Sequence, residues 1–156
     1  MNKFYAGIGS RSTPPLILEY MKSAAILLEE MGYTLRSGGA EGADRAFERG
    51  VSNPKNKIIL RTKHSTEQAE QLASTIHPMW SACNEYAKKL HGRNCQIILG
   101  ENLDIPAEFV LCWTLDGIER GGTRTGLVLA KQRGIPTFNL FNADDTERFA
   151  EFLRAL

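Results

Sequence analysis

The sequence lacks any apolar run close to the roughly 18 residues that a membrane-spanning helix requires. Its first residues hold one lysine and a short apolar stretch that soon meets glycine, unlike a secretory signal. The sequence also lacks a large excess of charges of one sign, since its 19 Lys and Arg residues nearly balance its 18 Asp and Glu residues and the formal net charge is +1. Proteins that coat DNA non-specifically carry a larger positive excess, so only a focused basic groove stays open for a nucleic acid. We therefore expect a cytoplasmic protein with no membrane partner.

Cysteines and histidines with disulfide or metal-ligand spacing are also scarce. The three cysteines are Cys83, Cys95 and Cys112, and the three histidines are His64, His77 and His91. An odd number of widely spaced cysteines without a C-x-x-C pair argues against a disulfide framework, and neither residue type shows the spacing of a zinc site. The sequence therefore predicts buried thiols in a reducing compartment, with no metal and no cofactor.

Three motifs of common nucleotide enzymes and hydrolases are absent. Gly7-Ile8-Gly9 is followed by Thr13-Pro14 where the dinucleotide-binding fingerprint needs its third glycine, and no acidic residue ends the next predicted strand. Neither a Gly-x-x-x-x-Gly-Lys-Ser/Thr loop nor a Gly-x-Ser-x-Gly elbow occurs. These absences argue against an NAD dehydrogenase, a P-loop nucleoside triphosphatase and the commonest serine hydrolases.

The apolar residues that are present alternate between strand and helix patterns. Strands are expected at residues 3–8, 33–36, 57–60, 108–113 and 136–139. Helices are expected at residues 16–31, 42–49, 65–75, 78–99, 122–133 and 144–156. Because no linker or repeat interrupts the alternation, it predicts one α/β domain over residues 1–156, a three-layer, doubly wound (Rossmann-like) fold with a mainly parallel sheet.

Glycine-rich segments follow three of the predicted strands. They read Gly7-Ile8-Gly9-Ser10-Arg11, Ser37-Gly38-Gly39-Ala40 and Arg120-Gly121-Gly122-Thr123-Arg124-Thr125. Ligands of doubly wound sheets bind beyond the carboxyl ends of the strands, where glycines and helix N-termini suit a phosphate. A tight turn alone explains any one such segment, but three at one sheet edge indicate a phosphate-bearing ligand.

Most residues of these segments receive a role under this hypothesis. Ser10 and Arg11 hold one edge of the phosphate, and Arg93 or Arg124 supplies charge, because a guanidinium group binds two phosphate oxygens at once. The predicted ligand-binding residues are Gly9, Ser10, Arg11, Ser37, Gly38, Gly39, Arg93, Asn94, Trp113, Gly121, Gly122, Thr123, Arg124 and Thr125. Two alternatives stay open: Trp113 lies beside a base or packs in the core, and Arg93 binds phosphate or is a surface helix residue.

The order of these motifs resembles that of the Rossmann-like domain of DprA/Smf proteins. The motifs are Gly9-Ser10-Arg11, Ser37-Gly38-Gly39-Ala40-Glu41-Gly42-Ala43-Asp44, Arg93-Asn94 with Gly100, and Gly121-Gly122-Thr123-x-Thr125. The resemblance runs from about residue 3 to residue 140 and extends to the wider superfamily (SLOG) that contains the LOG-type nucleotide phosphoribohydrolases. It implies a site for nucleotide phosphates or a nucleic-acid backbone, and a homodimer or higher homo-oligomer.

The signature of the LOG enzymes, Pro-Gly-Gly-x-Gly-Thr-x-x-Glu, is not matched, because Val128 stands at the position of its glutamate. A glycosidase needs a carboxylate near the ribose, and the candidates in this chain are Glu41, Asp44 and Asp116. Asp44 has a second interpretation, in which it caps a backbone turn and does not contact the ligand.

The leading hypothesis is therefore binding of a nucleotide or nucleotide-derived small molecule through the Gly-rich loops. Two alternatives stay open: a nucleoside 5′-monophosphate N-glycosidase, and a DprA-like module that binds single-stranded DNA in recombination. Whether the chain is an enzyme is left open by the sequence.

Overall fold

A computed structural model describes residues 3–156, which form a five-stranded sheet and six α-helices. The strands are β1 (Lys3–Gly7), β2 (Tyr33–Ser37), β3 (Lys57–Ile59), β4 (Val110–Cys112) and β5 (Thr137–Asn139). The helices are α1 (Pro15–Glu30), α2 (Ala43–Gly50), α3 (Glu67–Ser74), α4 (Glu85–Leu99), α5 (Gly121–Gln132) and α6 (Ala143–Ala155). All neighbouring strands pair in parallel in the order β3-β2-β1-β4-β5, so the strand order reverses between β1 and β4. The predicted doubly wound, Rossmann-like fold is confirmed.

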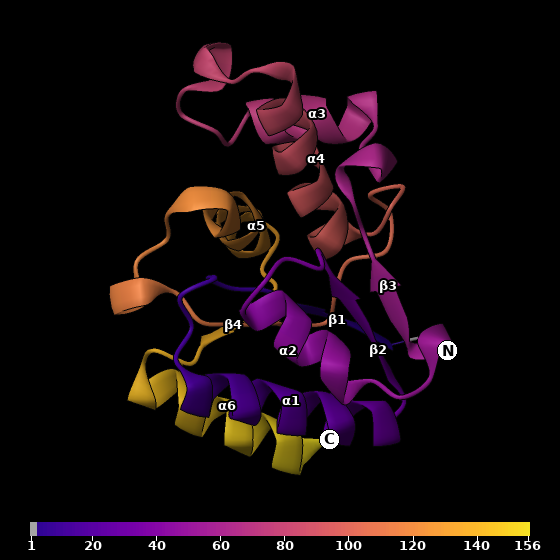
Figure 1. Ribbon diagram of the computed structural model, residues 1–156, viewed down its shortest axis with the longest axis vertical. Coiled ribbons are helices and arrows are strands. Elements are labelled where there is room, and N and C mark those ends of the chain that lie inside the picture. Colours follow the sequence, from indigo (N-terminus) through magenta and orange to yellow (C-terminus); the bar gives the residue numbers. More distant parts are fainter. Residues whose placement is uncertain (1–2) are drawn as a thin grey trace.

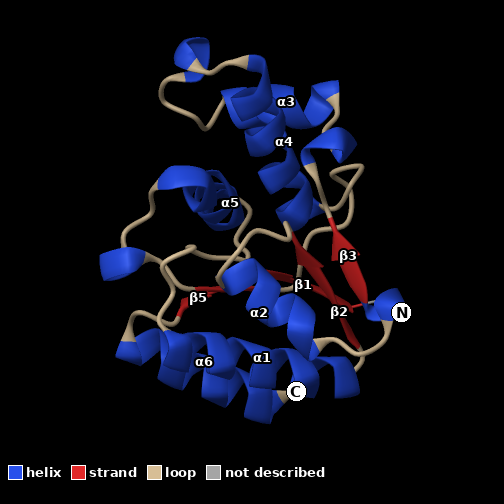
Figure 2. Ribbon diagram, viewed as in Figure 1, coloured by secondary structure: helices blue, strands red, loops and turns tan. Residues whose placement is uncertain are grey.

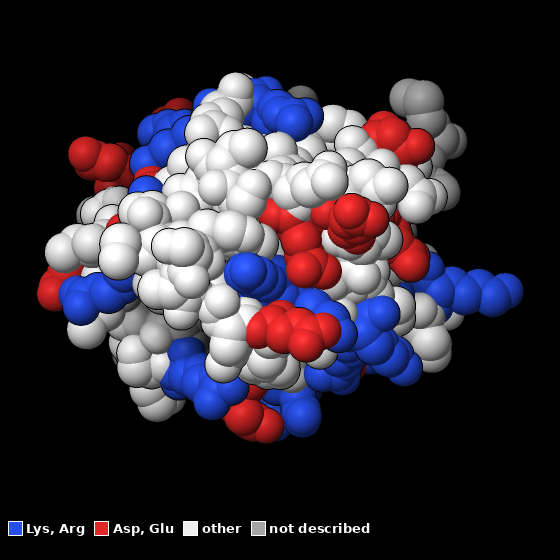
Figure 3. Space-filling view, turned by 90° about the horizontal axis from the view of Figure 1, so that it is seen from above, with Lys and Arg blue, Asp and Glu red and all other residues white. Residues whose placement is uncertain are grey.

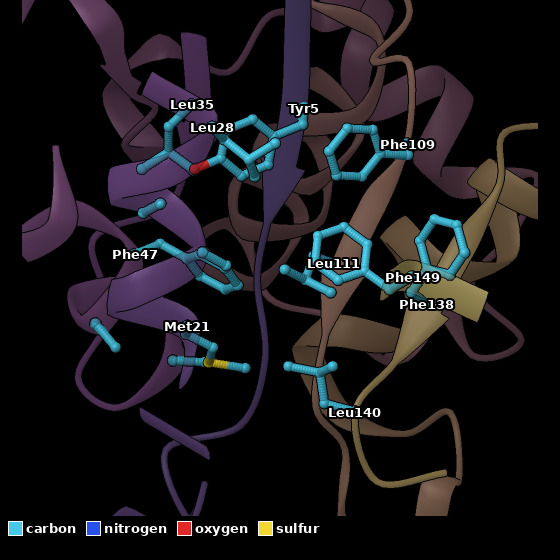
Figure 4. Packing of buried hydrophobic residues seen from close by; sticks show 14 of the residues in the cluster. Tyr5, Met21, Leu28, Leu35, Phe47, Phe109, Leu111, Phe138, Leu140 and Phe149 are labelled. Carbon is cyan, nitrogen blue, oxygen red and sulfur yellow. The ribbon is translucent and has the colours of Figure 1, made fainter. Parts of the chain in front are cut away.

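Helices cover both faces of the sheet. In Figures 1 and 2, α1, α2 and α6 lie on one side, while α4 and α5 lie on the other with α3 packed against α4. Successive strand residues point to opposite faces, so Tyr5 joins the cluster under α1 and Ala6 joins the cluster under α4 and α5. The first cluster is rich in aromatic rings, with Tyr5 stacked on Phe109 at a centroid distance of 5.4 Å (Figure 4).

Glu29 near the end of α1 fixes the segment that follows α2. Its carboxylate accepts hydrogen bonds from the backbone N–H of Ser52 (2.9 Å) and Asn53 (3.0 Å), the hydroxyl of Ser52 (3.0 Å) and the side-chain amide of Asn56 (2.9 Å). These bonds favour the ionised form, the one from the Ser52 backbone most of all, and lower the pKa of Glu29 to about 2.

Arg36 ties β2 to the end of α4. The side chain is 2% exposed, and its Nη2 donates to the carbonyl oxygen of Ile105 at 2.6 Å. The guanidinium carbon lies 4.3 Å from the centroid of the Phe4 ring. Burial lowers the pKa of Arg36 to about 10, because the charged form loses its hydration.

The prediction of a helix over residues 78–99 is wrong in its first part. Residues Trp80–Ala82 form a short 3-10 turn, and α4 begins only at Glu85. The cause is Asn84, whose side-chain oxygen accepts from the backbone N–H of Ala87 at 2.8 Å and so acts as an N-cap. Within residues 3–156, none of the helices has the length and apolar character needed to cross a membrane.

Candidate functional site

A cavity of about 490 Å³ opens at the carboxyl edge of the sheet, beside the switch between β1 and β4. Its walls come from the β1–α1 turn, the start of α2, the side of α4 and the start of α5. This is the position at which doubly wound folds bind their ligands. Figure 3 shows acidic and basic side chains interspersed on the face seen from above, so this face carries no large area of a single charge sign.

The β1–α1 turn brings Gly9, Ser10 and Arg11 to one wall. A Cβ on Gly9 would lie 2.7 Å from the Cβ of Ala43 and 2.9 Å from the carbonyl oxygen of Trp113, so only glycine fits. The Ser10 backbone N–H donates to that same carbonyl at 3.1 Å, which continues the β1–β4 pairing to the cavity. Arg11 is exposed and presents its charge at the rim.

The start of α5 forms the opposite wall. Its N-cap, Arg120, makes no side-chain capping bond, and the next three residues, Gly121, Gly122 and Thr123, line the cavity. The side-chain amide of Asn94 donates to the Gly122 carbonyl at 2.6 Å and holds this turn against α4. The first N–H groups of a helix have no intrahelical partner and carry the positive end of the helix dipole. This wall can therefore bind an anion.

Asp44 and Arg93 are buried charged residues in the wall of the cavity. Asp44 is 6% exposed and its carboxylate accepts from the backbone N–H of Ala40 at 3.3 Å. Burial raises the pKa of Asp44 to about 6, against the opposing effects of backbone hydrogen bonds and the charge of Arg93. A carboxyl group with this pKa can take up or release a proton near neutral pH.

Arg93 is a fixed cation in the wall. Its guanidinium donates to the carbonyl oxygens of Gly38 (3.0 Å) and Leu60 (2.9 Å), and to the side-chain oxygen of Asn94 (3.0 Å). Burial lowers its pKa, and the nearby charge of Asp44 opposes this. Arg93 therefore joins the ends of β2 and β3 to α4 as well as lining the cavity, and the interpretation as a surface helix residue is wrong.

The structure brings most of the predicted residues together. Those that line the cavity are Gly9, Ser10, Arg11, Asp44, Arg93, Asn94, Gly121, Gly122 and Thr123. Ser37, Gly38 and Gly39 do not line it. The Ser37 hydroxyl is buried and donates to the Gly7 carbonyl at 2.6 Å, and the glycines leave room for the guanidinium groups of Arg93 and Arg61.

Trp113 does not reach the cavity. Its side chain is 5% exposed and belongs to the core cluster under α1, 6.1 Å from the Phe141 ring between centroids. The structure thus favours core packing over a position beside a base.

The three candidate carboxylates are separated. Only Asp44 lines the cavity. Glu41 is exposed and lies 3.6 Å from Arg45, and Asp116 is exposed and lies 3.8 Å from Arg120. Arg120 itself lines the cavity and was missed by the sequence prediction, although its place directly before two glycines and a helix is the pattern of an anion-binding N-terminus.

Arg124 and Thr125 face a second, smaller cavity of about 300 Å³. The Arg124 guanidinium donates to the Ile76 carbonyl at 3.3 Å, and the Thr125 hydroxyl lies 2.8 Å from Nδ1 of His91. The turn at Gly121 and Gly122 lines both cavities and separates these two residues from the main one.

No protein-family model and no curated protein matches this chain. Among solved structures, its fold is similar to that of DNA processing protein A (DprA) from Helicobacter pylori, a protein that binds single-stranded DNA, with a TM-score of 0.59 and 19% sequence identity. The match covers 96% of this chain and 72% of that one. The DprA-like fold that the motif order predicted is confirmed, and the link to the wider superfamily with the LOG-type enzymes stays a prediction.

Proposed function

We propose that the main cavity binds the phosphate backbone of single-stranded DNA. The observation that carries this proposal is the N-terminus of α5, where Gly121, Gly122 and Thr123 line a cavity at the switch point without a side-chain cap. Unpaired N–H groups and the helix dipole favour phosphate oxygens at such a position. The likeness to H. pylori DprA, which binds single-stranded DNA, supports a polynucleotide over a mononucleotide as the ligand.

Three arginines supply positive charge around the cavity, although Arg120 also pairs with Asp116 and Arg93 lies near Asp44. Arg11 and Arg120 lie at the rim with exposed side chains, and Arg93 is fixed in the wall. Each neutralised phosphate of a single strand contributes a slope of about −0.7 to the dependence of log affinity on log salt. Contact with two or three phosphates predicts a slope of about −1.4 to −2.1, which suits a nearly neutral protein.

The lining favours backbone contacts over recognition of bases. Among the described residues, no aromatic ring lines the cavity, and its apolar part consists of aliphatic side chains such as Ile8, Leu90 and Ile97. Single-strand binding proteins that stack bases use aromatic side chains. We therefore expect little preference for base sequence.

Fluorescence anisotropy with labelled oligothymidylates of increasing length tests the proposal. Affinity should rise from a dinucleotide to the length that fills the site and then level off, with the salt slope given above. Affinity that is already maximal for thymidine monophosphate would contradict a backbone ligand and favour a mononucleotide.

A small nucleotide ligand is the second candidate, and the burial of Asp44 in the cavity favours it. A volume of about 490 Å³ lies within the usual range for small-molecule sites, and the Asp44 pKa of about 6 suits general acid–base chemistry. Incubation with a panel of ribo- and deoxynucleoside monophosphates, followed by chromatography, separates the possibilities. Free base that disappears with Asp44→Asn would establish an N-glycosidase, while retention of an intact nucleotide would establish binding alone.

A further inference from the structure

Three potential metal ligands meet outside the main cavity. His77 and Cys83 lie in the segment between α3 and α4, and His91 lies on α4. One ligand atom from each lies within 4.8 Å of the other two. The Cys83 sulfur is 3.8 Å from Nε2 of His77, and the ring centroids of His77 and His91 are 4.5 Å apart. Cys83 follows His77 by six positions and His91 follows Cys83 by eight, which is not the spacing of a known short metal-binding motif.

We propose that His77, Cys83 and His91 bind a divalent transition-metal ion of the zinc class. Zinc bonds of about 2.0–2.1 Å to nitrogen and 2.3 Å to sulfur place tetrahedral ligand atoms about 3.3–3.6 Å apart. The Cys83–His77 separation of 3.8 Å is close to this value, so small side-chain movements bring the three atoms around one ion. Two imidazoles with one thiolate favour zinc over magnesium or calcium, which prefer oxygen ligands.

A residue outside the cluster holds one of the rings in place. Nδ1 of His91 lies 2.8 Å from the Thr125 hydroxyl, which leaves Nε2 for the metal. Metal-bound histidines usually have such a partner on their other nitrogen, because it fixes the tautomer and the ring orientation. On His77, Nδ1 accepts from the Met79 N–H at 3.0 Å. A metal on Nε2 requires the proton of the ring to be on Nδ1, where it prevents this nitrogen from accepting a hydrogen bond. Metal binding at Nε2 therefore breaks the bond from Met79.

Three protein ligands leave one tetrahedral position for water or an anion. His77 and His91 both line the smaller cavity of about 300 Å³, which also contains the Gly121–Gly122 turn of the main cavity. A metal at this place would therefore lie beside the turn proposed to bind phosphate. The metal proposal itself does not depend on that function, because it rests on the three ligands alone.

Titration of the metal-free full chain with Co²⁺ and Zn²⁺ tests the proposal. A single site should give the visible absorption of tetrahedral cobalt with a thiolate-to-metal band in the near ultraviolet, and zinc should displace it. Cys83→Ser should abolish the thiolate band. Thr125→Val, which keeps all three ligands, should weaken binding about 10- to 100-fold. His64→Gln is the matched control, since His64 lies outside the cluster and should leave binding unchanged.

Circular dichroism of each variant establishes that it is folded before binding is compared. Absence of cobalt absorption in the folded wild-type chain would overturn the proposal, and so would a thiolate band that persists in Cys83→Ser. If Cys83→Ser does not fold, the wild-type spectrum and Thr125→Val test the proposal instead. A thiolate band in the wild type with weaker binding in Thr125→Val supports the site, and the absence of both overturns it.

Discussion

Replacement of Asp44 by asparagine should remove a large part of the pH dependence of stability. Burial raises the pKa of Asp44 from 3.8 to about 6 in the folded chain. The folded protein therefore keeps a proton that the unfolded chain releases between these values, so stability falls as the pH rises through the interval and is constant above it. At 1.36 kcal/mol per pKa unit, the loss is about 3 kcal/mol.

Urea unfolding at several pH values between 3 and 7 measures this effect. The difference in the free energy of unfolding between the wild type and Asp44→Asn should fall by about 3 kcal/mol as the pH rises across the range. Taking this difference removes the contributions of the other titrating groups, which both proteins share. Glu41→Gln is the matched control: this neighbouring carboxylate is exposed and pairs only with Arg45 among the described residues, so its difference curve should stay within about 0.5 kcal/mol. Parallel curves for the wild type and Asp44→Asn would refute the burial argument.

Further expectations concern the core, the helix contacts and the site. Glu29→Gln should lower the free energy of unfolding by about 1–2 kcal/mol at pH 7, less than the full pKa shift implies because the carboxylate is partly exposed. This loss should vanish in acid unfolding as the pH falls from 4.5 toward 2, because the wild-type carboxylate then becomes protonated. Gly50→Ala should cost about 1–3 kcal/mol in urea, because its Cβ would overlap the α1 backbone and lie 2.6 Å from the Cβ of Ala25. Arg36→Met should cost about 2–3 kcal/mol by the same assay, because it leaves buried carbonyl groups without a donor. Affinity for inorganic phosphate, measured by calorimetry, should rise below pH 6 as Asp44 loses its charge, and Asp44→Asn should remove that rise.

The sequence was sufficient to predict the sheet, because five short apolar strands separated by helices allow few arrangements other than a doubly wound one. It also indicated the edge of the sheet at which the cavity lies, because glycines follow β1 and begin α5. Trp113 directly follows β4 and packs in the cluster under α1 together with Leu111, because alternate residues of an extended chain point to the same face. The sequence left the position of Trp113 open, because it does not show which face of the sheet α1 covers.

Other features depend on contacts between distant segments. The environment of Asp44 includes the charge of Arg93, which is 49 positions away in the chain. The cluster of His77, Cys83 and His91 joins the segment between α3 and α4 to α4 itself, and the helix predicted over residues 78–99 would have kept Cys83 and His91 more than two turns apart. Spacing within the sequence contains neither piece of information.

Two substitutions at Gly122 test the central claim most directly. A Cβ at this position has open space, with the nearest atom, the amide nitrogen of Asn94, at 3.8 Å. Gly122→Ala should therefore bind single-stranded DNA nearly as the wild type does. Gly122→Asp keeps the helix, since an acidic residue suits the first turn, but it places a negative charge where the phosphate is expected. Anisotropy with one oligothymidylate at fixed salt should show that Gly122→Asp alone lowers the affinity at least 10-fold. This is the size expected for the loss of one hydrogen bond to a charged group. Equal affinity of the two variants would contradict phosphate binding at the start of α5.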